Sequence, residues 1–341
     1  MDRGMSYGLV PIEPWDSTNE RGRSRMTSAP LVAEDRGLFP YARWRAQLPS
    51  LAQQFREGKP FQHIQVSDFL STRLAQDLSD EFPVPNSSAW IQYKHYNENK
   101  TGLTKRELFP PLLAKVTEEL NSPEFVAWIS EVSGIPDLIA DPELEGGGLH
   151  QSGRGGFLNV HTDFNMHHHH KNWRRRINLI LYLNPGWQPE WGGALEFWDV
   201  NMRHCVTKVP PLLNHAVIFK SNEIAFHGFP GKLTCPGNVS RKSLAFYYYT
   251  IERDAVHDTH STNYMPRPED GRAKAALIWL DKQAVHLYSK AKERFGIGDD
   301  IASKVLGLLS RKRRTARVEP SPASQDADPI APLPTPQDSE N

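Results

Sequence analysis

The stretch GGGLHQSGRGGFLNVHTDFN, residues 146–165, predicts a strand, a glycine-rich turn and a second strand that ends in His161-Thr162-Asp163. A loop then leads to RRRINLILYLN, residues 174–184, which has the composition of a third strand. Side chains of an extended segment alternate between its two faces, so His161 and Asp163 lie on the same face. Together they supply two of the three ligands of a facial metal site.

The third ligand of such a site would be a histidine from elsewhere in the chain, and His227 in the segment EIAFHGFPG is available. Two histidines and one carboxylate, with open positions opposite them, form the site of non-haem Fe(II) oxygenases. An H-x-D pair alone carries little weight in a chain with 14 histidines and 40 acidic residues. The segment SRKSLAFYYYT adds weight, because its Arg241 would hold the distal carboxylate of a dicarboxylic co-substrate that chelates the metal. Lys242 points to the opposite face of that strand.

The order of these motifs, H-x-D, YLN, GG, HG and then R, resembles the prolyl-4-hydroxylase type of Fe(II)/2-oxoglutarate-dependent dioxygenase. The resemblance covers Phe61 to Ile251 and is strongest from His150 onward. It implies a double-stranded β-helix, or jelly roll, which holds the iron at three residues. These are His161, Asp163 and His227.

The resemblance also implies where the co-substrate binds. The 2-oxoglutarate would be gripped by Arg241 and by Tyr182, the tyrosine of YLN. Gln151 stands ahead of the first ligand, where the family often carries a tyrosine, and is therefore a candidate co-substrate contact. The interval between His227 and Arg241 is longer than is usual in the family. The extra residues lie in FPGKLTCPGNV, a Gly/Pro-rich loop that can absorb an insertion without moving either strand.

The activity that the resemblance implies is the oxidative decarboxylation of 2-oxoglutarate with O₂, coupled to hydroxylation of an unactivated C–H bond. Succinate and CO₂ are the by-products, and ascorbate is a candidate reductant. Peptidyl proline, a free amino acid, a sugar and a natural-product intermediate are all candidate substrates. One alternative is a zinc hydrolase that uses the same three ligands and a metal-bound water. Another is a non-catalytic jelly-roll binding module.

The rest of the chain predicts short strands bounded by turn residues, together with helices that carry apolar stripes. Serine at positions 71 and 122 is expected to cap two of these helices, and the second cap is followed by proline at the first helical position. The expected fold is mainly β, a jelly-roll core with helices packed outside. We expect strands at 61–69, 90–96, 192–198 and 216–219, and helices at 41–57, 110–121 and 274–295.

The expected organisation has one catalytic core between flanking segments. The helix at 274–295 would carry Leu277, Leu280, Ala284 and Leu287 on one face, and a second helix would begin at Ile301. The termini are polar or proline-rich and predict poor order. The segments are 1–36 (poorly ordered), 37–145 (helices and strands), 146–253 (jelly-roll core), 254–311 (helical extension) and 312–341 (disordered tail).

Composition narrows the function classes. The chain has 341 residues with 40 basic and 40 acidic side chains, so its zero formal charge gives no global electrostatic case for nucleic acid or membrane. The two cysteines, Cys205 and Cys235, form no disulfide framework and favour a reducing compartment. The N-terminus carries no apolar signal-like run. These features predict a soluble, cytoplasmic protein with a peptide or small-molecule substrate.

Four conspicuous motifs have ordinary interpretations. The run His167–His170 predicts a solvated loop, because successive residues cannot all face one ion; the alternative is that His167 touches substrate. Arg174–Arg176 and Arg311–Arg314 are interpreted as a loop edge and a charged helix end. Gly192-Gly193 predicts a tight turn rather than a phosphate cradle, because no helix follows it. Cys205 and Cys235 are treated as small hydrophobic side chains.

Overall fold

The computed structural model describes residues 37–85, 89–253 and 260–295, all within the unit Asp35–Asn341. The expectations for residues 1–36, for a helix from Ile301, for Arg311–Arg314 and for the tail 312–341 lie outside the described residues. The helices are α1 (Tyr41–Ala46), α2 (Leu48–Glu57), α3 (Thr72–Asp80), α4 (Pro111–Leu120), α5 (Pro123–Ser133) and α6 (Arg272–Phe295), with short 3-10 turns at Arg106–Leu108 and Pro189–Trp191. The strands are β1 (His63–Ser67), β2 (Ile91–Lys94), β3 (Glu98–Leu103), β4 (Ile139–Ala140), β5 (Gly148–Ser152), β6 (Phe157–Thr162), β7 (Trp173–Tyr182), β8 (Leu195–Trp198), β9 (Cys205–Val209), β10 (His215–Lys220), β11 (His227–Phe229), β12 (Arg241–Ile251) and β13 (Asn263–Tyr264).

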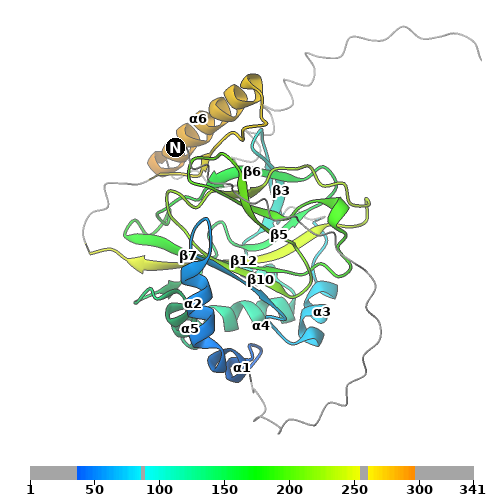
Figure 1. Ribbon diagram of the computed structural model, residues 1–341, viewed down its shortest axis with the longest axis vertical. Helices are drawn as coiled ribbons and strands as arrows, with labels where there is room; N and C mark the ends of the chain where they lie inside the picture. The colour runs from blue at the N-terminus through cyan, green and yellow to red at the C-terminus, as the bar shows by residue number, and fades with distance from the viewer. Residues whose placement is uncertain (1–36, 86–88, 254–259, 296–341) are drawn as a thin grey trace, which may run out of the picture. The chain divides into compact units, whose positions relative to one another are not determined.

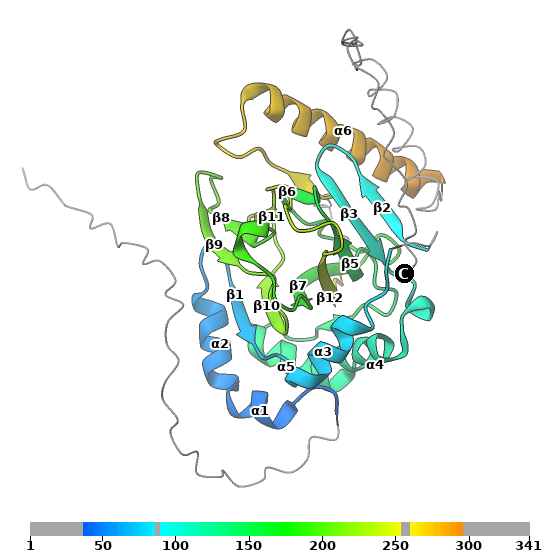
Figure 2. The same cartoon turned by 90° about the vertical axis from the view of Figure 1, so that its right-hand side faces the viewer.

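The strands form one antiparallel sheet that curls around an interior, which confirms the predicted jelly-roll class (Figure 2). Its order is β1-β10-β7-β12-β5-β3-β6-β11-β8-β9, with β2, β4 and β13 attached to β3, β12 and β6. The two ends of this order approach each other, since the Thr207 hydroxyl at the β9 end donates to the Lys59 carbonyl just before β1. The long central strands β7 and β12 pair along nearly their whole length.

Alternation along β7 builds two different cores. Leu179 and Leu181 face outward and join the apolar layer beneath α1–α5, which cover one side of the barrel (Figure 1). Tyr182 faces the interior, where it packs with aromatic rings from β8 and β10. The helix-facing side of the sheet is therefore apolar. Its inner side carries both apolar and polar residues, so functional side chains can lie there.

The helix signals were predicted well. The Ser71 hydroxyl accepts from the Leu74 amide at 3.3 Å, and the Ser122 hydroxyl accepts from the Phe125 amide at 3.2 Å, so both predicted caps are confirmed. The single helix expected over 41–57 was wrong, because it is divided into α1 and α2 at Gln47. Pro49 explains the break: its ring lacks an N–H and clashes with the preceding turn, which places it near the start of a new helix.

The last helix packs differently from the prediction. α6 spans Arg272–Phe295, but two residues of the expected apolar face, Leu280 and Leu287, are 50% and 70% exposed. The face that meets the barrel instead carries Ile278, which is 1% exposed, and Asp281. In the described part of the chain, no helix combines the length and the apolar character needed to cross a membrane.

Candidate metal centre and adjoining cavity

Three predicted site residues meet inside the barrel. His161 on β6 pairs directly with His227 on β11, and Asp163 follows the end of β6. His161 Nε2 lies 3.5 Å from Asp163 Oδ1, and His227 Nε2 lies 3.6 Å from Asp163 Oδ2. Two donors that each lie about 2.1 Å from one ion are roughly 3–3.5 Å apart, so this spacing fits a shared metal. The three could hold an ion, and each side chain is largely buried.

The backbone fixes the tautomer of both histidines. His161 Nδ1 lies 2.9 Å from the Asn159 carbonyl, and His227 Nδ1 lies 2.8 Å from the Ala225 carbonyl. A carbonyl only accepts hydrogen bonds, so each Nδ1 carries the proton and each Nε2 presents a lone pair toward Asp163. Burial lowers the pKa of His227 to about 4 although Asp163 acts in the opposite direction. A neutral imidazole is the form that binds metals.

The two oxygens of Asp163 have different surroundings. Oδ2 accepts from Asn178 Nδ2 at 2.7 Å and lies 3.1 Å from a guanidinium nitrogen of Arg175. Oδ1 faces His161 Nε2. Burial alone would raise the pKa of this carboxyl, but the charge of Arg175 holds that pKa well below its usual range. The carboxylate is thus anchored through Oδ2, while its two oxygens face the two histidine rings.

Sequence reasoning missed Arg175, which it assigned to a loop edge. The residue lies in β7, is 3% exposed, and places its guanidinium carbon 3.3 Å from the centroid of the Tyr247 ring. Its Nε also donates to Asn178 Oδ1 at 2.7 Å, so Arg175 and Asn178 hold Asp163 together. The outward side of the strand is taken by Arg176, which bonds to Thr250. The loop-edge interpretation was therefore wrong for Arg175.

Arg241 is buried on the opposite side of the interior. Its Nε donates to the Gly193 carbonyl at 2.7 Å, and one terminal nitrogen donates to the Tyr182 hydroxyl at 3.0 Å. Among the described residues, no carboxylate forms an ion pair with it. Burial lowers the pKa of this guanidinium, which the Tyr182 contact only partly offsets. Lys242 instead reaches out to the Ser79 carbonyl, as the alternation of the strand predicted.

The glycine at position 193 has a steric reason. Gly193 has a φ of 78°, and a Cβ at this position would lie 2.6 Å from a Leu233 methyl carbon and 3.1 Å from Arg241 Cδ. Only glycine allows the backbone to approach the arginine this closely. Both glycines lie between the 3-10 turn Pro189–Trp191 and β8, and the Gly193 carbonyl orients Arg241. The long loop after β11 packs Leu233 and Cys235 against Trp187, so the insertion has a small core of its own.

One cavity joins these features. His161, Asp163 and His227 line it together with Arg241, Gln151 and Lys100. Its remaining walls are Arg175, Asn178, Tyr247, His150, Ser152, Leu158, Ile180, Leu195, Phe219, Phe229, Ser243 and Ala245. The triad and the buried arginine therefore face the same space.

Gln151 contributes an amide to this cavity. Its Nε2 is bonded to the Ser240 hydroxyl, and its buried Oε1 has no hydrogen-bond partner among the described residues. A half-turn of the amide would let the Ser240 hydroxyl donate to Oε1 and would direct the NH₂ donors elsewhere. In that orientation the side chain could donate to an anionic group in the cavity.

The polyhistidine run is not a solvated loop throughout. His167 is 1% exposed, and its Nδ1 accepts from the backbone amides of His169 and His170, each at 3.1 Å. The other ring nitrogen lies 3.5 Å from Asp141 Oδ1. The solvated-loop prediction was wrong for His167, because its ring holds the turn together. His167 is also absent from the described lining of the cavity, so its contacts are structural.

Comparisons with known proteins agree with this geometry. Residues 147–249 match the family model described as the 2OG-Fe(II) oxygenase superfamily. The chain is 31% identical over 130 residues to prolyl 3-hydroxylase OGFOD1 of Mus musculus; the match covers 37% of this chain and 22% of that protein. This chain thus spans less than a quarter of the curated relative's length.

Solved structures are similar at lower identity. A prolyl-4-hydroxylase from Pseudomonas putida is 19% identical, with a TM-score of 0.44 and coverage of 59% of this chain and 98% of that one. A prolyl hydroxylase from Trichoplax adhaerens, solved with a hypoxia inducible factor peptide, is 16% identical with a TM-score of 0.44; the match covers 60% of this chain and 92% of that one.

Proposed function

We propose that this chain, whose residues 147–249 match the model of the 2OG-Fe(II) oxygenase superfamily, is an Fe(II)- and 2-oxoglutarate-dependent dioxygenase that hydroxylates an unactivated C–H bond. The observation that carries the proposal is one cavity lined both by a two-histidine, one-carboxylate set and by a buried arginine that has no acidic partner among the described residues. The first feature fits a divalent metal with open positions. The second fits the far carboxylate of a dicarboxylic co-substrate.

The metal would be held by His161 Nε2, His227 Nε2 and the carboxylate of Asp163. Two backbone carbonyls already set the histidine tautomers, and Asn178 with Arg175 already anchors the other carboxylate oxygen. Bound Fe(II) would supply O₂ activation driven by decarboxylation of 2-oxoglutarate. The protein side of the reaction is then positioning: the triad would fix the metal, and Arg241 would orient the co-substrate.

The co-substrate would be held by Arg241 and Tyr182. A buried guanidinium without a counter-ion is costly, and a carboxylate that pairs with it through two parallel hydrogen bonds removes that cost. Tyr182 is not among the described residues that line the cavity, but its hydroxyl accepts from Arg241 and would orient the guanidinium toward the carboxylate. Gln151 would donate its amide to the same ligand after the half-turn described above.

We propose peptidyl proline as the first substrate class to test, since the mouse relative is a prolyl 3-hydroxylase. Free amino acids, sugars and natural-product intermediates follow as further candidates. We also propose a reducing, cytoplasmic setting, which suits the two free thiols Cys205 and Cys235 and an oxidation-sensitive ferrous site. Ascorbate is the reductant to include in assays.

A zinc hydrolase built on the same triad is less well supported. Such an enzyme needs a general base near the metal-bound water. Among the described cavity-lining residues, Asp163 is the only carboxylate, and it belongs to the triad. The hydrolase would also give the buried Arg241 no function. A non-catalytic binding module would give the intact triad no function.

The test is anaerobic reconstitution with Fe(II), 2-oxoglutarate and ascorbate, followed by addition of O₂ and measurement of succinate. Succinate formed in the absence of a substrate, which is uncoupled turnover, identifies the enzyme class before the substrate is known. His227→Ala is the inactive reference, and His215→Ala is the matched control, because His215 is a buried histidine on β10 bonded to Ser67. Succinate from the wild type no greater than from His227→Ala would overturn the proposal.

A further inference from the structure

The segment after the family-matched region forms part of the surroundings of the metal centre. β13 pairs with β6, so that Tyr264 lies opposite His161. The Tyr264 ring is 4% exposed, and its centroid lies 5.4 Å from that of the His161 ring. The Met265 amide also donates to the Val160 carbonyl at 2.8 Å. Residues beyond 249 therefore support the strand that carries the first metal ligand.

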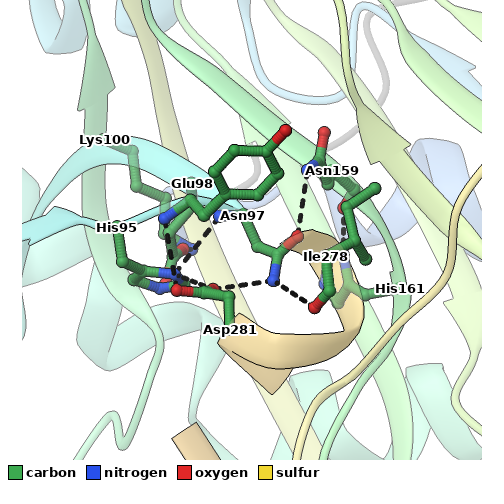
Figure 3. A network of polar contacts seen from close by, with 9 residues as sticks. His95, Asn97, Glu98, Lys100, Asn159, His161, Ile278 and Asp281 are labelled. Atoms are coloured by element: carbon green, nitrogen blue, oxygen red, sulfur yellow. Dashed lines mark hydrogen bonds and ion pairs between the residues drawn. The ribbon is translucent and has the colours of Figure 1, made fainter. Parts of the chain in front are cut away.

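α6 adds a buried carboxylate to this support (Figure 3). Asp281 Oδ2 lies 2.7 Å from His95 Nδ1 and accepts from Asn97 Nδ2 at 2.7 Å. Asp281 Oδ1 accepts from the Tyr96 amide at 3.3 Å. One side chain of α6 thus binds all three residues of the turn that joins β2 to β3. Two chains of contacts lead from this turn toward the cavity.

The first chain leads to His161. Asn97 donates to Asp281 and to the Ile278 carbonyl, and its Oδ1 accepts from Asn159 Nδ2 at 3.0 Å. The Asn159 amide donates to the Asn97 carbonyl at 2.8 Å. The Asn159 carbonyl in turn accepts from His161 Nδ1. The peptide group that sets the tautomer of His161 is therefore fixed from both its side chain and its backbone (Figure 3).

The second chain leads to Lys100. His95 lies between two carboxylates, with its Nε2 2.7 Å from Glu98 Oε1. Glu98 Oε2 lies 3.1 Å from the ammonium of Lys100, whose side chain lines the cavity. Burial would lower the pKa of His95, but its bonds to Asp281 and Glu98 outweigh burial and raise that pKa to about 9. At neutral pH the chain alternates acid, base, acid and base, which holds each member in place.

We propose that Asp281 is a positioning residue of the metal centre: from α6 it fixes His161 through Asn97 and Asn159, and Lys100 through His95 and Glu98. The inference rests on the proposed function. It extends that function by making α6, which lies outside residues 147–249, part of the working site. Asp281 touches neither the metal position nor the cavity, and it acts through the turn between β2 and β3.

The experiment compares Asp281→Asn with Asp270→Asn. Asp270 is a matched control, because it accepts from the Arg267 amide at 2.9 Å and pairs with Lys274 at the start of the same helix, outside the network. The probe is Co(II) added to apoprotein under anaerobic conditions, with its visible absorption recording both affinity and coordination geometry. We expect Co(II) affinity to fall about tenfold in Asp281→Asn, at the lower end of the effects of residues behind metal ligands. Asp270→Asn should bind Co(II) like the wild type.

A second variant tests the His161 chain alone. Asn97→Ala leaves Asp281 in contact with His95 and keeps the backbone bond to Asn159, but it removes the side-chain links of Asn97 to Asp281 and Asn159. If Asp281→Asn does not fold, this variant should still show the weakened Co(II) binding and an altered Co(II) spectrum. Wild-type affinity and spectrum in folded Asn97→Ala or Asp281→Asn would overturn the positioning role. A wild type that binds Co(II) normally but forms no succinate would refute the proposed oxygenase alone. A wild type that binds neither Co(II) nor Fe(II) would refute both.

Discussion

The two ends of the cavity balance their charges in opposite ways. At the metal end, the Asp163 carboxylate is already paired with Arg175 and hydrogen-bonded to Asn178. At the arginine end, the Arg241 guanidinium has a hydroxyl, a carbonyl and aromatic rings around it, and no ion pair among the described residues. The side chains at the metal end are therefore already in place to bind a cation. The buried positive charge at the arginine end would be neutralised by a bound anion.

We infer from this difference that the cavity accepts a ligand that binds the metal at one end and Arg241 at the other. A dicarboxylic acid that chelates the metal at one end and pairs with Arg241 at the other satisfies both at once. A neutral ligand would leave the guanidinium uncompensated. Each of the following variants acts on one end, and the contrast between them tests whether the two ends have separate roles.

The largest effect is expected from His161→Ala or His227→Ala at the metal end. Each variant leaves two donors, which cannot define the three-point geometry that the barrel presents. We expect iron content after anaerobic reconstitution and succinate formation both to be abolished, while His215→Ala retains both. Full turnover in either variant would move the site elsewhere, with His150, another histidine that lines the cavity, as the first residue to examine.

At the other end, Arg241→Ala should raise the concentration of 2-oxoglutarate needed for half-maximal succinate formation by roughly 10²–10⁴-fold. Iron binding should remain, because Arg241 contacts no member of the triad. Arg241→Lys should restore only part of the loss, since an ammonium lacks the planar fork. Lys242→Ala is the control on the opposite face of β12. A larger defect in Lys242→Ala would show that the two residues have been assigned the wrong roles.

Sequence patterns were sufficient for the residues on regular strands. Alternation placed His161 beside Asp163 and separated Arg241 from Lys242, and the structure brings the predicted triad together. The roles of these residues remain predictions until ligands are measured. The family resemblance carried by the order of motifs also implied the jelly roll, which the structure confirms.

The two-residue alternation of side chains along a regular strand could not predict that Arg175 faces inward, because β7 contains a β-bulge. Tyr248 pairs with Ile177, whereas the next residue, Tyr249, pairs with Arg175, so Arg176 is skipped. A strict period of two from the inward-facing Asn178 would have turned Arg176 inward. Asp281 was out of reach for a different reason: it bonds to His95 across 186 positions of sequence, and no local pattern records such a contact.

The metal end is also supported by the buried charge of His95, which lies outside the cavity. This charge predicts how the stability of the fold depends on pH. The pKa of His95 is raised from 6.5 to about 9, so its protonated form stabilises the folded protein fully below pH 6.5, and this stabilisation is lost as the pH rises through 9. From pH 7 to 9.5 we expect the wild type to lose on the order of 2 kcal/mol of unfolding free energy relative to His95→Gln. Urea denaturation at each pH measures this, and parallel pH profiles would contradict it.

The smallest and most discriminating effect is expected from Arg175→Gln. Glutamine keeps a hydrogen-bond donor near Asp163 Oδ2 but removes the charge, and Asn178 still holds the same oxygen at 2.7 Å. The carboxylate should therefore stay in place with less restraint, and we expect Fe(II) affinity to fall about tenfold. Once iron is saturating, the 2-oxoglutarate requirement should equal that of the wild type, because Arg241 is untouched. This pattern is the reverse of the one expected for Arg241→Ala.

A shift in the 2-oxoglutarate requirement at saturating iron would mean that Arg175 also binds the co-substrate, and the two ends would not be independent.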